Sequence, residues 1–286
     1  MNIKSTFLAL GAYCAALAMQ AQPANFWNDP RKNQDNRLEN VSTYFAYEND
    51  QLAQAGKKDG SSRFLSIEGQ WNFKWVKNAN ERPAGFYALE YDDSKWDKMP
   101  VPGIWECNGF GNAVYVNTSY AWRNDWQTNP PYVQDLANHV GSYRRWFNLP
   151  ANWNGQKVYI HIGSATSNLT MYVNGQYVGY SEDSKVAAEF DITKFVKPGQ
   201  RNLIAMQVMR WCDGSYLEDQ DFWRLCGIAR ECYMYARPQA HIHDLFITPD
   251  LTPDYKDGML EVKTDFEDAQ SGLSLAFQLK DKDGKS

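Results

Sequence analysis

From residue 64 onward, the chain is built from short runs in which apolar and polar residues alternate. Aromatic residues occupy every second position of residues 71–75, and valine or isoleucine does so in residues 158–162. Alternation with period two is typical of a strand with one buried face, and no long stretch shows the helical period. Many short strands with long connections predict an all-β fold, an antiparallel jelly-roll β-sandwich over residues 63–237.

Residues 169–180 give the clearest local prediction. The alternating runs Leu169–Val173 and 176–180 flank the dipeptide Asn174-Gly175. An Asn-Gly pair favours the two-residue type I′ turn, because the backbone twist of that turn matches the twist of paired strands. The segment is therefore expected to form a tight β-hairpin within the sandwich.

The dipeptide Arg237-Pro238 marks the expected start of a second unit, residues 238–286. Three more strands are predicted there, at residues 241–248, 259–266 and 273–280. Three strands leave one apolar face and one edge uncovered, so they are marginally stable alone. We expect that this unit is incomplete and that the chain is a fragment of a longer protein.

The N-terminal residues have the pattern of an export signal. Lys4 supplies a positive charge, residues 7–19 are mostly apolar, and Ala21 is suited to precede a cleavage site. The apolar run is too short to span a bilayer comfortably, and no second candidate follows it. Residues 1–21 are therefore interpreted as a signal peptide, which predicts an exported, periplasmic or extracellular protein that does not bind a membrane.

Residues 22–62 form the next compositional region. They are polar, rich in asparagine and poor in periodic apolar residues. This composition predicts an extended arm, because too few apolar side chains are present to build an independent core. Trp27, Tyr44 and Phe45 are candidates for attaching the arm to a neighbouring surface.

Charge and cysteine content narrow the functional classes. The net charge of −5 offers no basic footprint for nucleic acid, and no glycine-rich phosphate-binding loop occurs. Four cysteines lie outside the signal: Cys107, Cys212, Cys226 and Cys232. They could form disulfides, as an exported protein permits, or remain free thiols, because a domain of this size does not need disulfides for stability. The pair His241-x-His243 could ligate a metal or form one face of an ordinary strand.

Residues 210–228 are the strongest candidate for function. This segment carries four acidic residues and several aromatic ones between two alternating runs, at residues 202–209 and 232–236. A segment that only reversed the chain would be short and rich in glycine, asparagine or proline. Long polar loops on a β scaffold frequently carry function. A binding site and a buried contact between domains both remain open at this point.

Several motifs carry a family resemblance when they are taken in order. They are LSIEGQWNF from Leu65, VPGIW from Val101, VYVN ending at Asn117, NPPYV from Asn129, YVNGQYVGYSEDS from Tyr172, EFDIT from Glu189, and residues 210–228. Together they resemble the N-terminal part of the large β-galactosidases of glycoside hydrolase family 2, over most of the chain after about residue 36.

The resemblance implies a galactose-binding-like jelly-roll domain followed by an immunoglobulin-like β-sandwich that residues 238–286 only begin. In the family, a TIM barrel follows and carries two catalytic glutamates, an acid/base and the nucleophile of a retaining mechanism. A TIM barrel alone takes about 250 residues, so it is absent from this chain. No catalytic residue is therefore expected in this chain.

Two residues correspond to substrate-binding residues of the family. Asn117 matches the asparagine that reaches the galactosyl group, and Asp213 matches the aspartate that contacts sugar and ligates a sodium ion. An amide donates to and accepts from sugar hydroxyls, and a carboxylate oxygen suits a hard cation. The residues after Asn117 depart from the family pattern, because Ala121 stands where proline is usual. The resemblance also implies Mg²⁺, with its ligands near the catalytic site expected in the absent barrel.

The remaining acidic and aromatic residues receive structural interpretations. Glu218, Asp219 and Asp221 are expected to pair with Arg210 or Arg224 and hold the loop against a neighbouring domain. Among the tryptophans, Trp71 and Trp75 are expected in the core. Trp122 and Trp126 lie in a polar loop and are the more plausible exposed pair.

The resemblance thus implies the N-terminal portion of an enzyme that hydrolyses terminal non-reducing β-D-galactosides with retention. Its partner would be a β-galactoside or oligosaccharide, and the full-length parent would form a homo-oligomer. The chain alone is expected to show no turnover. One alternative is a free-standing, non-catalytic carbohydrate-binding module, and another is a chain that complements a partner bearing the barrel.

Overall fold

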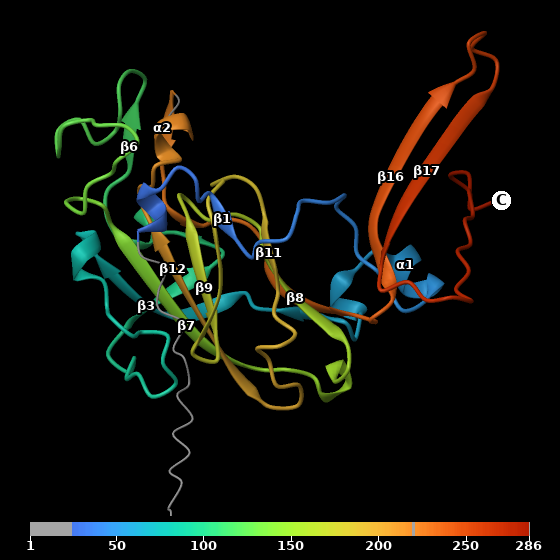
Figure 1. Cartoon of the computed structure of the whole chain (residues 1–286), viewed down its shortest axis with the longest axis horizontal. Coiled ribbons are helices and arrows are strands. Elements are labelled where there is room, and N and C mark those ends of the chain that lie inside the picture. The colour runs from blue at the N-terminus through green and yellow to red at the C-terminus, as the bar shows by residue number, and fades with distance from the viewer. Residues whose placement is uncertain (1–24, 219–220, 286) are drawn as a thin grey trace, which may run out of the picture.

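The computed structural model describes residues 25–218 and 221–285, and they form an antiparallel β-sandwich from which a long hairpin projects (Figure 1). The predicted signal peptide and its cleavage site at Ala21 lie outside the described residues. In spatial order the seven-stranded sheet contains β1 (Gln34–Asp35), β10 (Gln176–Ser181), β9 (Leu169–Val173), β12 (Arg201–Met209), β7 (Val140–Asn148), β3 (Gly69–Val76) and β4 (Asp97–Val101). The four-stranded sheet contains β11 (Ala188–Asp191), β8 (Lys157–Ile162), β15 (Cys232–Arg237) and β2 (Phe64–Ser66).

The predicted all-β sandwich is confirmed, and its core follows from period two. Trp71 and Phe73 of β3 are fully buried, and Trp75 on the same face is half-buried against the same cluster. Ile160 of β8 and Met206 of β12 meet them from other strands of the two sheets. Because the side chains of a strand point alternately to its two faces, each alternating run contributes one row to this core.

The hairpin predicted at residues 169–180 is also confirmed. β9 and β10 pair in antiparallel fashion, with Gln176 opposite Val173. The turn residues Asn174 and Gly175 have φ angles of 50° and 81°. Positive φ at both central positions is the requirement of a type I′ turn, which asparagine and glycine meet at low cost.

The arm runs along one edge and the outer face of the sandwich. β1 adds an edge strand to β10, and Trp27 is buried between the arm and the end of the sandwich. Leu38 and Phe45 pack on three tyrosines of the four-stranded sheet, whose outer face they cover. The arm is not extended throughout, because it also contains η1 (Phe26–Asn28), α1 (Asp50–Ala55) and η2 (Lys58–Gly60).

Beyond residue 238, β16 (His241–Leu251) and β17 (Gly258–Glu267) form a two-stranded hairpin that extends away from the sandwich (Figure 1). Two of the three predicted strands are therefore confirmed. The third, at residues 273–280, is wrong, because this segment is irregular and pairs with no described strand. Its alternating apolar residues are exposed; for example, Leu279 is 73% exposed. Alternation of apolar and polar residues is compatible with a β-strand, but a strand also needs a neighbouring strand with which to form hydrogen bonds.

The remaining elements are short and lie at the ends of the sandwich. They are β5 (Gly103–Ile104), β6 (Val114–Val116), β13 (Phe222–Arg224), β14 (Gly227–Ile228), α2 (Ser215–Glu218), η3 (Ala79–Glu81), η4 (Glu106–Asn108) and η5 (Ala151–Trp153). Within the described part of the chain, no helix has the length and apolar character needed to cross a membrane. The four described cysteines form no disulfide with one another; Cys107 is exposed and the other three are buried.

Candidate functional site

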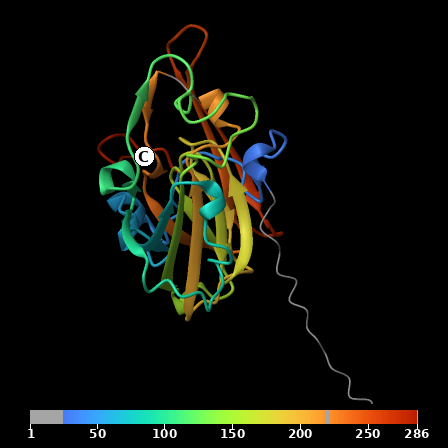
Figure 2. The same cartoon turned by 90° about the vertical axis from the view of Figure 1, so that its left-hand side faces the viewer.

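The segment at residues 210–228 closes one end of the sandwich. After β12 ends at Met209, the chain forms α2, returns as β13 to pair with β6, and then pairs β14 with β5. Both views place β6 and α2 at the same end of the sandwich (Figures 1 and 2). The segment therefore gathers residues from several loops at one place, as the sequence interpretation required.

Asp213 lies at the base of this segment and is 6% exposed. Its N–H donates to the carbonyl of Trp27 at 2.8 Å, so the arm helps to fix its backbone. Its Oδ1 accepts the N–H of Gly214 at 2.8 Å, whereas its Oδ2 is buried without a hydrogen-bond partner. A buried carboxylate oxygen without a partner is costly, so this atom is the natural contact point for a cation or a hydroxyl group.

Glu182 faces Asp213 from the end of β10. β10 and β12 are each antiparallel to β9, so they run in the same direction and end at the same edge of the sheet. The ligand atoms of Glu182, Cys212 and Asp213 all lie within 4.8 Å of one another. Glu182 also accepts a hydrogen bond from the hydroxyl of Tyr180 at 2.6 Å. The sheet topology therefore assembles two buried carboxyl groups that are distant in sequence.

Burial determines the protonation of this pair. It raises the pKa of Glu182 to about 8, and the neighbouring Asp213 contributes in the same direction. Burial also raises the pKa of Asp213, although contacts with Glu182 and the Gly214 N–H act against that effect. Near neutral pH, Glu182 is therefore mainly protonated beside the Asp213 carboxyl group.

The donor set suits a hard cation more than a soft one. Burial raises the pKa of the Cys212 thiol well above its usual range, so the sulfur stays protonated and is a poor metal ligand. The carboxylate of Asp213 is the charged donor of the cluster, and its Oδ2 has no other partner. Oxygen donors with a low total charge fit a cation such as sodium, which the family resemblance implies for Asp213.

The second residue identified from sequence, Asn117, is exposed in the loop that follows β6. This loop contacts α2, because the ring of Tyr120 packs edge-on against Tyr216 at 5.0 Å. Among the described residues, no hydrogen bond joins Asn117 to Asp213. The two lie at the same end of the sandwich, and aromatic side chains from their loops pack against each other.

The expectation that Trp122 and Trp126 form an exposed pair is wrong. Trp122 is fully buried and is stacked between Tyr120 and Trp126, with ring separations of 4.9 Å on each side. Trp126 is half-buried in the same cluster, which also includes Trp211. This cluster is a second hydrophobic core, and it was not predicted because the residues next to Trp122 and Trp126 in sequence are mostly polar. It is built from loops and from the segment at residues 210–228, and it holds the Asn117 loop in place.

The other acidic residues of the segment have partners that were not predicted. Glu218 accepts from the backbone N–H of Ser184 at 2.8 Å, and Asp221 accepts from the hydroxyl of Tyr115 at 2.5 Å. Arg210 instead contacts a ring nitrogen of His139 at 3.0 Å and a backbone carbonyl. The predicted pairing with Arg210 is therefore wrong for Glu218 and Asp221, the alternative pairing with Arg224 stays a prediction, and Asp219 lies outside the described residues.

The sequence interpretation did not select Glu182. It lies within the motif YVNGQYVGYSEDS but directly after a strand, and nothing in the local pattern connects it with Asp213. A usable signal was the position of both carboxyl groups just beyond strand ends. That signal could be used only once β10 and β12 were known to run in the same direction.

Comparison with known proteins agrees with the motifs. Residues 64–238 match the family model described as glycosyl hydrolases family 2, sugar binding domain. Among curated proteins, a β-galactosidase of Priestia megaterium is 38% identical over 267 residues, which is 91% of this chain and 26% of that protein. A β-galactosidase of Vibrio vulnificus is 40% identical over 201 residues, covering 70% of this chain and 19% of that protein. The chain spans about a quarter of the length of such relatives.

Solved structures with a similar fold include a β-glucuronidase from an uncultured Clostridium species. Its TM-score is 0.56 at 18% identity, covering 80% of this chain and 36% of that chain. A β-glucuronidase of Bacteroides uniformis has a TM-score of 0.56 at 22% identity, covering 72% of this chain and 22% of that chain. At these identities the likeness concerns the sandwich fold alone.

Proposed function

The chain belongs to the glycosyl hydrolases of family 2 through its sugar-binding domain, and we propose that it is the N-terminal portion of a β-galactosidase. The parent enzyme would hydrolyse terminal non-reducing β-D-galactosides with retention of configuration. The observation that carries this proposal is the 38% identity to a β-galactosidase across 91% of the chain. The chain matches only about a quarter of that relative, so its contribution would be to substrate binding and not to bond cleavage.

We propose that Asp213 and Asn117 form one wall of the sugar subsite. Asp213 offers a buried carboxylate oxygen without a partner, which could hold Na⁺ and accept from a sugar hydroxyl. Asn117 is exposed at the same end of the sandwich and can both donate to and accept from sugar hydroxyls. The sodium ion would fix the orientation of hydroxyl groups through its positive charge. The Mg²⁺ ion and the two catalytic carboxylates would belong to the remainder of the parent.

The end of the sandwich also presents an aromatic surface suited to a contact with the rest of the parent enzyme. Tyr115, Phe222 and Trp223 of the β6–β13 pair are each more than half exposed. Exposed aromatic side chains gathered on one small sheet mark a contact surface more often than a solvated one. This surface would hold residues 210–228, and with them Asp213, against the domain that carries out the chemistry.

The direct test uses the full-length parent with Asp213→Asn and Asn117→Ala. Each change removes a hydrogen-bonding group, so we expect kcat/KM for a chromogenic β-galactoside to fall by about 10-fold or more. Asp213→Asn should also remove most of the dependence of the activity on Na⁺. Asp135→Asn and Asn152→Ala are matched exposed controls and should behave as wild type. Wild-type kinetics and an unchanged Na⁺ dependence in both site variants would disprove this role.

The chain alone is expected to show no turnover of the same substrate. Activity that persists through repurification would contradict the proposal that the chemistry lies elsewhere in the parent. Activity that appears only when the chain is mixed with the remainder of the parent would identify it as a complementing fragment.

A free-standing carbohydrate-binding module is the second candidate, favoured by the match to a sugar-binding domain. Titration calorimetry with galactosides separates the two, because a complete module binds without the rest of the enzyme. The leading proposal expects weak or no binding at Asp213, since most walls of that subsite would be missing. We further propose that the protein is exported and that its full-length parent is a homo-oligomer, both of which fractionation and light scattering can test.

A further inference from the structure

A pocket of about 430 Å³ lies between the arm and the outer face of the four-stranded sheet. Residues 39–45 of the arm form one side, while Tyr233, Tyr235 and His161 form the floor. The loops carrying Lys185 and Arg230 border it. Neither Asn117 nor Asp213 lines this pocket, so it is separate from the subsite proposed above.

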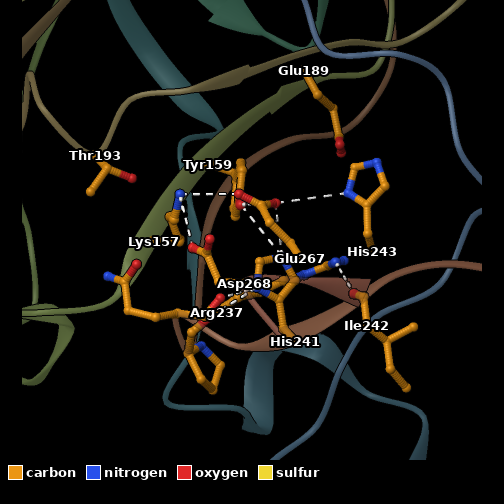
Figure 3. A network of polar contacts seen from close by, with 12 residues as sticks. Lys157, Tyr159, Glu189, Thr193, Arg237, His241, Ile242, His243, Glu267 and Asp268 are labelled. Carbon is orange, nitrogen blue, oxygen red and sulfur yellow. Dashed lines mark hydrogen bonds and ion pairs between the residues drawn. The ribbon is translucent and has the colours of Figure 1, made fainter. Parts of the chain in front are cut away.

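Arg237 is the distinctive feature of this pocket. It is only 7% exposed, and its guanidinium lies between the rings of Tyr44 and Tyr235, at 4.6 Å and 5.1 Å from their centroids. Its Nη1 donates to the Tyr44 hydroxyl at 2.6 Å. The same nitrogen donates to the carbonyl of Ile242 at 3.1 Å (Figure 3). Arg237 therefore joins the arm, the sheet and the start of the projecting hairpin.

The other edge of this guanidinium has no partner among the described residues. Nε is buried without a hydrogen bond, Nη2 has none either, and no carboxylate of the described chain forms an ion pair with Arg237. A buried cation without a counter-charge is costly. The Nε and Nη2 hydrogens are the parallel pair that a carboxylate accepts side-on with both oxygens. The free edge therefore has the chemistry of a carboxylate receptor.

The acidic residues of the pocket do not supply that carboxylate. Both oxygens of Glu189 are engaged, one by His161 at 2.7 Å and the other by the Tyr235 hydroxyl at 3.0 Å. Glu231 is paired with Lys58 at 2.8 Å. Of the lining carboxylates, only Glu39 lacks a partner, whereas the lining cations Lys185, Arg230 and Arg237 all lack a carboxylate within the described chain. The lining acids and cations are equal in number, so the feature that a carboxylate ligand would recognise is the free edge of Arg237 and not a net charge of the pocket.

We propose that this pocket binds a carboxylate-bearing sugar, such as a uronic acid, with the carboxylate on the free edge of Arg237. Arg230 and Lys185 at the mouth would add electrostatic attraction. Exposed Asn40 and Thr43 on the arm offer amide and hydroxyl groups for the sugar hydroxyls. A pocket of about 430 Å³ accommodates one or two sugar rings. The site goes beyond the proposed function, because it uses none of the residues assigned to the galactoside subsite.

The test is titration calorimetry of the 286-residue chain with sodium D-galacturonate, with D-galactose and sodium acetate as matched probes. We expect galacturonate to bind and the other two to bind at least about 10-fold more weakly, since each lacks half of the recognised chemistry. Arg230→Gln lies at the exposed mouth and should weaken galacturonate about 3- to 10-fold. Arg237→Lys keeps the charge and most of the packing but loses the two-pronged contact, so it should weaken binding about 10-fold or more.

Two further variants locate the binding. Arg201→Gln removes an exposed arginine on the other sheet, and Asn117→Ala removes a residue of the proposed galactoside subsite; both should bind galacturonate as wild type. Equal binding of galactose or acetate, unchanged affinity in both Arg230→Gln and Arg237→Lys, or no binding of galacturonate would each overturn the proposal. Loss of binding in Asn117→Ala alone would move the ligand to the galactoside subsite, which overturns this site and leaves the proposed function intact.

Discussion

The sandwich and the projecting hairpin use the same alternating pattern with opposite results. In β3 of the sandwich, Trp71 and Phe73 are fully buried, whereas in β16 of the hairpin Phe246 is 60% exposed and Ile247 is 58% exposed. Both regions form well-paired antiparallel strands. Alternation therefore predicts the strand, while burial depends on whether a second layer lies against its apolar face.

The two regions also differ in what holds them. Apolar packing between two sheets holds the sandwich together, but the hairpin is attached at its base through polar contacts. Glu267 of β17 accepts from Lys157 at 3.0 Å and from the Tyr159 hydroxyl at 3.2 Å, and it lies 3.4 Å from a ring nitrogen of His241 (Figure 3). Contacts of this kind depend on geometry and charge, and each contributes less than a large buried side chain.

The largest expected difference in the free energy of unfolding is between alanine variants of two phenylalanines, one in each region. Phe73→Ala leaves a cavity in the sandwich core and should lower the free energy of unfolding by about 4 kcal/mol. Phe246→Ala removes an exposed ring of the same size and should change it by less than about 0.5 kcal/mol. Urea denaturation followed by tryptophan fluorescence measures both. Similar losses in the two variants would mean that the hairpin is packed against another surface in solution, and the contrast between the regions would fail.

The next prediction compares charged pairs. Arg144 of β7 is buried, with a side-chain exposure of 1%, and it donates to Asp93 at 2.8 Å. Asp93→Asn keeps the shape but leaves the guanidinium without its counter-charge, so the free energy of unfolding should fall by about 3 kcal/mol. Asp92→Asn, at the exposed neighbouring position, is the matched control. Arg144 also donates to the backbone carbonyls of Phe86 and Ala88. A loss below about 1 kcal/mol in Asp93→Asn would show that these carbonyls suffice to stabilise its charge.

Most of the sandwich could be predicted from sequence because its signals are local. Alternation identified the strands, and Asn174-Gly175 identified a turn whose backbone only a few residue types adopt easily. The segment at residues 273–280 shows the limit of that approach. Its apolar alternation is clean, yet a strand exists only with a hydrogen-bonded neighbour, and that neighbour is a property of the whole fold.

The candidate site was predictable only in part for the same reason. A family resemblance pointed to Asn117 and Asp213, but the carboxyl group that faces Asp213 comes from Glu182, beyond a different strand. Trp122 was misplaced because its polar neighbours in sequence suggested solvent, while its true neighbours are rings from distant loops. Both cases depend on which strand ends and loops share one end of the sandwich, which no local pattern contains.

A pH prediction separates the histidines of the two regions. His139 of the sandwich is 8% exposed, and its pKa is lowered to about 4, first by burial and then by the nearby Arg210 and Lys77. Since the folded pKa lies below the unfolded value of about 6.5, the unfolded chain binds the proton more readily between these values. This contribution to stability is therefore present above about pH 6.5 and is lost as the pH falls toward 4.

The loss between pH 7 and pH 5 should be on the order of 2 kcal/mol from His139. His139→Gln retains an acceptor for Arg210 but cannot titrate, so its stability should fall less over the same range. Urea denaturation of both proteins at the two pH values measures the difference. Parallel pH profiles for wild type and His139→Gln would show that other groups cause the acid sensitivity. His241 and His243 at the hairpin base face the carboxylate of Glu267 instead.

The smallest expected effect concerns the base of the hairpin. Burial raises the pKa of Glu267, but the hydrogen bond and charge of Lys157 outweigh that effect, and the pKa is lowered overall. Glu267→Gln removes the charge that Lys157 and the histidines face, and it should lower the free energy of local opening of the hairpin by about 0.5–1 kcal/mol. Asp268→Asn, whose carboxylate lies 3.7 Å from Lys157 and is 54% exposed, is the control and should cost less.

Global unfolding is too coarse to detect the consequence of Glu267→Gln, because the sandwich dominates it. Hydrogen exchange of the β16 and β17 amides should be about 2- to 5-fold faster in Glu267→Gln, while the amides of β3 and β7 exchange as in wild type. Faster exchange in both regions would mean that the hairpin and the sandwich open as one cooperative unit. The polar base would then couple the two regions, and the difference in burial between them would not divide the molecule into parts of different stability.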